Sequence, residues 1–254
     1  MNESMAVLLD DVIGIVRAAG EVVLQVYRSD FEVRGKDDAS PVTEADERAE
    51  TLILQALAAR TPQIPVISEE AAAAGQVPEV GERFWLVDPL DGTKEFINRN
   101  GEFTVNIALI DNGEPVLGVV LAPALERLFA GARGCGAFIE QAGQHQPIHC
   151  RAVSPEGLDV VASRSHGDAQ ALEKFLDGRP VRSLKSAGSS LKICLVAAGE
   201  ADLYPRLGRT MEWDIAAGHA VLVAAGGQIR TLAGDVLRYG KPGLDNPHFY
   251  AHGL

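Results

Sequence analysis

The sequence predicts a layered α/β fold, and three observations support this prediction. Two segments near the N-terminus carry apolar residues at helical spacing. Apolar strands with an Asn-Gly turn signal follow one another over residues 103–140. After about residue 150 the chain changes to shorter units in which strands and helices alternate. Interleaved elements beside an antiparallel run favour packed layers over a doubly wound parallel sheet.

The first 150 residues are predicted to supply two helices and most of the strands. In chain order these are helix 4–28, helix 44–60 and strands 64–68, 83–87, 103–110, 115–122, 127–131 and 136–140. A polar loop containing Pro41 separates the two helices. Strand 83–87 has consecutive apolar residues, which is typical of a strand buried on both faces, and we expect it to end at Asp88.

The remainder of the chain is predicted to form a second lobe. Its elements are strand 158–163, helix 168–176, helix 188–199, strand 201–206 and helix 213–227, the last ended by its glycines. There is no linker long enough to separate two independent domains. We therefore expect one domain over residues 1–254, with lobes of about 1–150 and 151–254.

Composition and charge exclude several classes of function. With 46% hydrophobic residues the chain can form a full core, yet it has no apolar run long enough to span a membrane. A formal charge of -12 without a basic cluster argues against a nucleic-acid polymer as partner. The N-terminus lacks the basic region of a secretory signal, and the three cysteines follow no metal-ligand spacing. We expect a cytoplasmic protein, at most peripheral to the inner membrane, and the sequence leaves a homodimer open.

The segment "WLVDPLDGTKEF" places two carboxylates at the end of a buried strand. Pro89 removes a ladder donor and restricts Asp88 to an extended conformation, and Gly92 permits a tight turn. Thr93 is then expected to cap a short helix. Asp88 and Asp91 would lie near one point beside backbone N–H groups, which suits Mg²⁺ and phosphate together. The alternative is a turn in which both acids only cap the helix.

Two further acidic segments have a structural and a functional interpretation. Glu69 and Glu70 either begin a solvated helix or supply a third metal ligand. Asp46 either completes a capping box with Thr43, or reaches Thr93 and orients its hydroxyl for proton transfer from an attacking water. The spacing alone does not decide between these interpretations.

The second lobe adds candidate groups at the beginnings of its helices. Asp214 is either a capping residue on a tightly packed helix or a fourth metal-binding carboxylate. Gly188 and Ser189 open a helix with Lys192 one turn later, an arrangement that suits an anion but is also common without a ligand. His166 follows a strand end, where an ordinary loop histidine is expected.

Taken together, "SEE", "DPLDGTKEF" and "EWDIAAGHA" resemble the inositol monophosphatase-like superfamily of Mg²⁺-dependent, Li⁺-sensitive phosphatases. "GSSLKICLVAAGEADLYPR" and "WDIAAGHAVLVAAGG" are most similar to its CysQ-type 3'(2'),5'-bisphosphate nucleotidases, and the resemblance covers nearly the whole chain. It implies an αβαβα sandwich, two or three Mg²⁺ ions, inhibition by Li⁺, and hydrolysis of 3'-phosphoadenosine 5'-phosphate or its sulfated form.

The resemblance also implies roles for individual residues. The implied metal ligands are Glu69, Asp88, Asp91 and Asp214, with the carbonyl of Leu90. Gly92 and Thr93 would hold the scissile phosphate, and Asp46 with Thr93, assisted by Glu69, would activate the attacking water. The residues expected near the rest of the nucleotide are Gly188, Ser189, Lys192, Arg206 and Glu212, with Lys36 joining when its loop closes.

Three other functions remain open from the sequence. One is an inositol monophosphatase or fructose-1,6-bisphosphatase of the same superfamily. Another is a phosphatase with an aspartyl nucleophile, although in that motif one residue rather than two separates the aspartates. The last is a catalytically inactive module that binds phosphonucleotides or metal.

Overall fold

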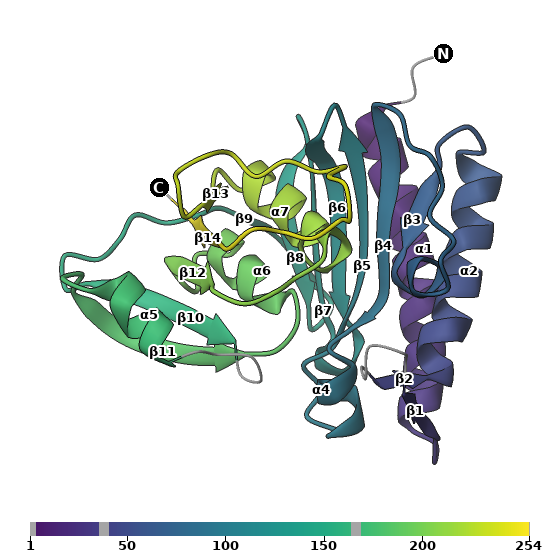
Figure 1. The fold of residues 1–254 in the computed structure, drawn as a ribbon, viewed down its shortest axis with the longest axis horizontal. Helices are drawn as coiled ribbons and strands as arrows, with labels where there is room; N and C mark the ends of the chain where they lie inside the picture. Colours follow the sequence, from purple (N-terminus) through teal and green to yellow (C-terminus); the bar gives the residue numbers. More distant parts are fainter. Residues whose placement is uncertain (1–3, 36–40, 164–168, 254) are drawn as a thin grey trace.

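The computed structural model describes residues 4–35, 41–163 and 169–253. Its elements stack in the order helices, sheet, helices, sheet, helix, so the predicted αβαβα layering is confirmed (Figure 1). Lys36 and His166, which the sequence analysis singled out, lie outside the described residues. Within the described part of the chain, no helix is long and apolar enough to cross a bilayer.

The first layer consists of α1 (Met5–Tyr27) and α2 (Glu44–Arg60), whose predicted bounds are confirmed to within one residue. Each helix buries one apolar stripe, represented by Val16 on α1 and Ile53 on α2, against the large sheet. Thr43 precedes α2 and caps it through its side chain. A short hairpin of β1 (Val33–Gly35) and β2 (Pro41–Thr43) forms where the sequence analysis expected only a loop.

The large sheet has seven strands in the order β3-β4-β5-β6-β7-β8-β9. Their bounds are β3 (Val66–Ser68), β4 (Arg83–Asp91), β5 (Thr104–Asp111), β6 (Glu114–Ala122), β7 (Arg127–Ala132), β8 (Gly136–Gln141) and β9 (Gln144–Ile148). β3 is parallel to β4, and the remaining pairs are antiparallel. Asn112 and Gly113 have φ angles of 53° and 73°, as the predicted hairpin turn requires.

Three short helices lie at the ends of these strands. α3 (Glu69–Ala73) follows β3, α4 (Thr93–Ile97) follows β4, and the 3₁₀ helix η1 (Pro123–Leu125) follows β6. The first two begin at the carboxyl ends of neighbouring parallel strands, so the sheet brings Glu69 and Thr93 to the same edge.

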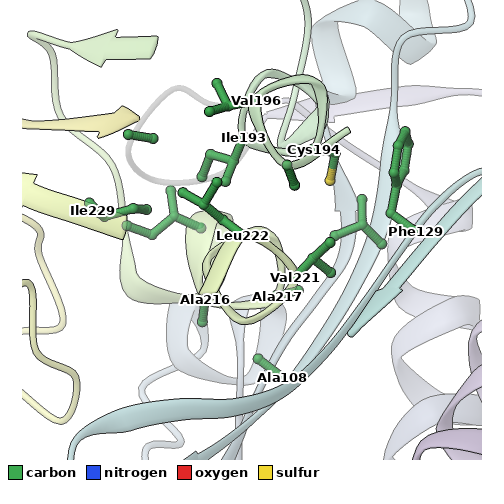
Figure 2. Close-up of a cluster of buried hydrophobic side chains, with 14 of the residues drawn as sticks. Ala108, Phe129, Ile193, Cys194, Val196, Ala216, Ala217, Val221, Leu222 and Ile229 are labelled. Carbon is green, nitrogen blue, oxygen red and sulfur yellow. The ribbon is translucent and has the colours of Figure 1, made fainter. Parts of the chain in front are cut away.

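The middle layer consists of α6 (Leu191–Ala197) and α7 (Glu212–Ala224), which lie between the two sheets (Figure 1). Figure 2 shows residues of both helices packed among side chains of the large sheet and β13. α7 approaches β6 closely: a Cβ atom added at Gly118 would lie 2.2 Å from the carbonyl oxygen of Ala217. Gly118, which has no side chain, therefore permits direct contact between the backbones of α7 and β6.

The second sheet has five strands in the order β11-β10-β12-β14-β13. Their bounds are β10 (Leu158–Ser163), β11 (Val181–Ala187), β12 (Leu203–Arg206), β13 (Gln228–Thr231) and β14 (Phe249–His252). Phe249 of β14 belongs to the core shared with α7, whereas Tyr250 on the opposite face contacts Phe175 of α5 (Ala169–Leu176). α5 thus covers the outer face as the fifth layer.

Two buried hydrophobic clusters lie on the two faces of the large sheet. One joins the sheet to α1 and α2, and the other joins it to α6, α7 and the second sheet. The second cluster includes Ile67 and Phe129 from the first lobe together with Ile193 and Phe249 from the second. The packing of this cluster is thus continuous across residue 150.

Candidate active site

A cleft of about 450 Å³ lies where the two lobes meet. The predicted site residues that line it are Glu69, Asp88, Leu90, Asp91, Gly92, Thr93, Gly188, Ser189, Lys192, Arg206 and Asp214. These residues come from β4, β12, α3, α4, α6, α7 and the turn before α6. Segments up to 145 positions apart in the sequence, from Glu69 to Asp214, therefore converge on one cleft.

The end of β4 is irregular at the point where the two aspartates lie. We expected this strand to end at Asp88, but pairing continues to Asp91, so that prediction was wrong. Asp88 is opposite Asn106 and Asp91 is opposite Thr104, which leaves one extra residue in β4. This β-bulge contains Pro89, which has no N–H for the ladder. Asp88 is 1% exposed, and its Oδ1 accepts a hydrogen bond from the Leu90 N–H at 3.0 Å.

Gly92 turns the chain from β4 into α4. Its φ angle is 88°, in the left-handed region that favours glycine. Gly92 is the N-cap of α4, so the expectation that Thr93 caps the helix was wrong. Thr93 is the first helical residue, and its hydroxyl donates to the Leu90 carbonyl at 3.4 Å. The Thr93 hydroxyl thus lies at the cleft beside the bulge.

Asp46 forms the capping box that was one of its two predicted interpretations. Its Oδ2 accepts hydrogen bonds from the backbone N–H and the hydroxyl of Thr43, each at 2.8 Å. The Asp46 carboxylate is 1% exposed, and β2, which precedes it, packs beside α4. The capping box therefore holds a buried carboxylate near the helix that begins with Thr93.

Asp214 also combines a helix-capping bond with a place in the cleft. It is the third residue of α7, which begins at Glu212, and its Oδ2 accepts from the Met211 N–H at 2.8 Å. Both predicted interpretations of Asp214 are thus compatible with the structure, because the capping residue lines the cleft.

Glu69, Asp88, Asp91 and Asp214 bring like charges together at the cleft, and we call these four carboxylates its acidic wall. Burial raises the pKa of Asp88 well above its usual range, and the charges of Glu69, Asp91 and Asp214 add to this rise. Burial raises the pKa of Asp91 to about 6, against the lowering effect of the Lys192 ammonium. Burial and the neighbouring carboxylates likewise raise the pKa of Asp214. Such a group of acids is stabilised by bound cations.

The donors in this wall fit a hard divalent cation by their chemistry. They are carboxylate oxygens with one nearby backbone carbonyl, which are the ligands that Mg²⁺ and Ca²⁺ prefer. Among residues 4–35, 41–163 and 169–253, no three His, Cys, Asp or Glu side chains already lie at metal-binding spacing. The fit therefore concerns donor type and charge, not a preformed coordination geometry.

Basic side chains of the second lobe also line the cleft, and we call them its basic wall. They are Lys192, Arg206 and Arg209. Lys192 is 4% exposed, and burial lowers its pKa to about 8 against the raising effect of Asp91. Its ammonium donates to the Ser189 carbonyl and lies 5.5 Å from the centre of the Tyr204 ring.

Two buried polar atoms on this wall have no hydrogen-bond partner within the described part of the chain. They are the Ser189 hydroxyl and the Arg206 Nε. Ser189 also has a φ angle of 43°, an uncommon conformation for a residue other than glycine. Unpaired buried polar groups and local strain are typical of binding sites, because a ligand can supply the missing partner.

The turn that carries Ser189 is attached to the first lobe by hydrogen bonds. The Gly188 N–H donates to the Glu102 carboxylate at 2.8 Å. The Ser190 hydroxyl contacts Thr104 Oγ1 at 2.9 Å and Asn106 Oδ1 at 2.8 Å. Because Thr104 and Asn106 lie opposite Asp91 and Asp88, these bonds link the basic wall to the acidic one.

Two described candidates, Asp46 and Glu212, do not line the cleft. The Glu212 carboxylate is buried and accepts hydrogen bonds from the N–H groups of Gly240 at 2.8 Å and Lys241 at 2.9 Å. It also pairs with the Lys241 ammonium. Glu212 therefore stabilises the 240–241 turn, and we do not place it at the substrate.

Comparison with known proteins identifies the family. A sequence profile of the inositol monophosphatase family matches residues 5–252. The chain belongs to the inositol monophosphatase family. A curated relative, the 3'(2'),5'-bisphosphate nucleotidase CysQ of Escherichia coli O6:H1, is 50% identical over 91% of this chain and 94% of its own length.

Solved structures of the family have the same fold. The crystal structure of CysQ from Bacteroides thetaiotaomicron, a bacterial member of the inositol monophosphatase family, superposes with a TM-score of 0.81 and 38% identity. The match covers 98% of each chain. The inositol monophosphatase of Thermotoga maritima has a TM-score of 0.79 and 28% identity, over 96% of this chain and 91% of that one.

Sequence reasoning missed several residues that build this family member's cleft. Arg209 lines the basic wall, Glu102 holds Gly188, and Glu50 binds the first turn of α3. Glu50 had a detectable signal, because it lies beside Ala49 and Ile53 on the apolar side of a helix, where a carboxylate needs a partner. Glu102 and Arg209 lie outside helices and strands, where the pattern carries little information about tertiary contacts.

Proposed function

We propose that this chain is a Mg²⁺-dependent phosphatase that hydrolyses 3'-phosphoadenosine 5'-phosphate to AMP and phosphate. Its sulfated form would be a second substrate and would yield adenosine 5'-phosphosulfate. The observation that carries the proposal is the polarity of the cleft, which is lined both by the acidic wall and by Lys192, Arg206 and Arg209. A substrate with two phosphates suits such a cleft, because one phosphate can lie at cations on the acidic wall and the other at the basic wall.

The relatives support both the reaction and the substrate. The inositol monophosphatase family consists of metal-dependent phosphatases. Curated relatives that are 39% to 50% identical over most of the chain are named 3'(2'),5'-bisphosphate nucleotidase CysQ. A reaction on a phosphate monoester also agrees with the hard oxygen donors of the acidic wall.

The acidic wall would bind two or three Mg²⁺ ions. The ligands would be the carboxylates of Glu69, Asp88, Asp91 and Asp214 and the carbonyl of Leu90. Bound Mg²⁺ would supply the positive charge that lowers the pKa of an attacking water and offsets the charge of the phosphate. We expect Li⁺ to inhibit by competing for this wall.

The chain's own groups would orient the phosphate and accept a proton. The backbone N–H groups of Gly92 and Thr93, at the turn after β4, would hold the scissile phosphate. The Thr93 hydroxyl and the buried Asp46 carboxylate, assisted by Glu69, would take the proton from the attacking water. The hydrogen bonds from the N–H and hydroxyl of Thr43 would hold the Asp46 carboxylate in a fixed orientation for this role.

The basic wall would bind the second phosphate. Lys192 is held in place by the Ser189 carbonyl and the Tyr204 ring, and the Ser189 hydroxyl and Arg206 Nε have unused donor capacity. Arg206 also donates to the Arg209 carbonyl at 2.8 Å, which fixes the guanidinium group at the cleft. Such groups would discriminate a bisphosphate from a monophosphate.

One assay separates the proposed function from its alternatives. Phosphate release is measured from 3'-phosphoadenosine 5'-phosphate, inositol 1-phosphate and fructose 1,6-bisphosphate, with Mg²⁺, with chelator, and with added Li⁺. We expect Mg²⁺-dependent, Li⁺-sensitive release that is fastest with the nucleotide. Faster release from inositol 1-phosphate or fructose 1,6-bisphosphate would refute the substrate assignment, and full activity in chelator would refute the metal requirement.

Two further measurements test the residue roles. Arg206→Gln should reduce kcat/KM for 3'-phosphoadenosine 5'-phosphate by more than about tenfold, since bonds to charged groups contribute about 1.5–3 kcal/mol. It should change kcat/KM much less for 3'-AMP, which lacks the second phosphate. With a substrate whose 3'-phosphate is made chiral by oxygen isotopes, hydrolysis should invert the configuration at phosphorus, because water displaces the leaving group in one step. Net retention would show two displacements and hence a phospho-aspartate intermediate instead.

A further inference from the structure

The helix that carries Glu69 begins without the usual local cap. Ser68 is the N-cap of α3, yet among the described residues its side chain makes no capping hydrogen bond. The first N–H groups of a helix have no partner within the helix and need one from outside. In α3 these groups belong to Glu69, Glu70 and Ala71.

Glu50 of α2 supplies the missing partner. Its Oε2 accepts from the Glu70 N–H at 3.0 Å, and its Oε1 accepts from the Ala71 N–H at 3.0 Å. Both carboxylate oxygens are thus used on consecutive residues of one helical turn. Glu50 is 7% exposed, and a buried carboxylate of this kind is stable only because donors replace the water that it loses.

The same face of α2 also carries Asp46. Asp46 and Glu50 are four residues apart, so they lie one above the other on the helix. Both are buried, whereas Glu44 and Glu47 on the same helix are exposed. α2 therefore directs one acid to the capping box at Thr43 and the other to the start of α3.

Glu69 is the residue that depends on this attachment. It directly precedes the two N–H groups that Glu50 holds, and its side chain lines the cleft. It is also close enough to Asp88 to share a side-chain hydrogen bond with it. A shift of the first turn of α3 would consequently move Glu69 relative to Asp88.

We propose that Glu50 is a positioning residue that holds the first turn of α3 and thereby keeps the Glu69 carboxylate beside Asp88 for metal binding. This inference rests on the proposed metal-dependent function. Groups that orient metal ligands typically contribute 10–100-fold to metal affinity or activity. A shift of Glu69 should therefore weaken metal binding even though Glu50 itself does not reach the metal.

The test is direct metal binding by Glu50→Gln. The variant keeps one oxygen that can accept one N–H, but its NH₂ group would face the other N–H as a second donor. Mn²⁺ serves as the probe, because its free concentration can be followed by electron paramagnetic resonance without turnover. We expect a dissociation constant that is about 10–100-fold higher than that of the wild type. Amide hydrogen exchange at Glu70 and Ala71 should become faster.

A matched control removes a structural carboxylate that does not line the cleft. The Asp202 side chain is fully buried and accepts from the Asp159 N–H at 2.7 Å and from Arg151 Nε at 2.8 Å. Asp202→Asn should lower the unfolding temperature and leave the Mn²⁺ dissociation constant unchanged. Equal weakening of Mn²⁺ binding in this control would overturn the proposal, because general destabilisation would then explain both variants.

Mn²⁺ binding by the wild type and by Glu50→Gln distinguishes a failure of the positioning role from a failure of the metal site. If the wild type binds Mn²⁺ and Glu50→Gln binds it equally well, the positioning role is refuted while the metal site stands. If the wild type binds no Mn²⁺, the metal site and the positioning role fail together. Should Glu50→Gln not fold, Glu50→Asp retains the charge but is one methylene shorter, and we expect it to weaken binding several-fold; wild-type binding by this variant would overturn the proposal.

Discussion

Gly118→Ala tests whether close packing of α7 on the large sheet positions Asp214. The added Cβ would lie 2.2 Å from the Ala217 carbonyl oxygen and 2.8 Å from the Ala220 Cβ. Because both neighbours belong to a helix, the contact cannot be relieved by a side-chain rotation. We estimate that α7 must move by about 1 Å, at an overpacking cost of roughly 2 kcal/mol.

The expected effect on stability and activity follows from this displacement. A loss of about 2 kcal/mol lowers the unfolding temperature of a domain of this size by roughly 4–8 °C. Asp214 lies on the first turn of the same helix, one turn before Ala217. A misplacement of about 1 Å can reduce catalysis by as much as about 100-fold, and we expect at least a tenfold loss of kcat/KM here.

Two glycine variants serve as references for thermal unfolding and phosphate-release assays. Gly131→Ala would meet Ala224 and Val221 at 2.9 Å and 3.0 Å, farther along α7 from Asp214, so stability should fall with a smaller loss of activity. Gly14→Ala meets no atom within 4 Å and should stabilise α1 by about 0.5–1 kcal/mol. Wild-type stability and activity in Gly118→Ala would refute the claim that this contact fixes α7.

Other predictions concern the cleft and the buried core. Asp91→Asn should reduce phosphate release at least about 100-fold with an unchanged circular dichroism spectrum, because a neutral amide replaces a carboxylate of the acidic wall; turnover within a few-fold of wild type would remove Asp91 from the metal shell. Ser190→Ala should lower the free energy of unfolding by about 1–3 kcal/mol in urea titrations, since Thr104 and Asn106 lose a buried partner. Burial lowers the pKa of His219 to about 3, so only the unfolded state takes up this proton between about pH 6.5 and 3. The free energy of unfolding should therefore decrease as pH falls through that range, and an equally steep decrease in His219→Gln would contradict this origin.

Long periodic segments were predictable because their own residues determine them. α1 and α2 have apolar stripes that few other structures can bury, and their bounds were correct to within one residue. The hairpin between β5 and β6 was predictable from Asn112-Gly113, since few residue pairs adopt positive φ at both positions.

Four strands that were not predicted from the sequence, β9, β11, β13 and β14, form through pairing with neighbouring strands. β9 and β11 lie at the sheet edges and expose most of their residues, so they lack the alternation that marks a half-buried strand. β13 and β14 have only four residues each and form through pairing with each other, and β14 also pairs with β12. Pairing of this kind depends on tertiary contacts that no local pattern records.

The cleft was predictable where its residues lie in motifs at strand ends and helix starts. Asp88, Asp91 and Asp214 are of this kind, and the structure brings them together. Glu50 and Glu102 act through hydrogen bonds to backbone groups 20 and 86 positions away, and such partners follow only from the folded chain. Sequence patterns therefore located the acidic wall better than the contacts that hold it in place.

The bulge in β4 gives the spacing of the two aspartates a geometric meaning. Side chains alternate between the faces of a regular strand, so residues three positions apart, such as Asp88 and Asp91, would point to opposite faces. The extra residue of the bulge corrects this parity, and both carboxylates line the cleft. Two aspartates separated by a single residue would point to the same face of a regular strand. A bulge between them would turn one of the two to the other face. Substitutions at Pro89 or Leu90 that keep the bulge preserve the pairing of the aspartates, whereas an insertion or deletion of one residue there changes the parity on which the acidic wall depends.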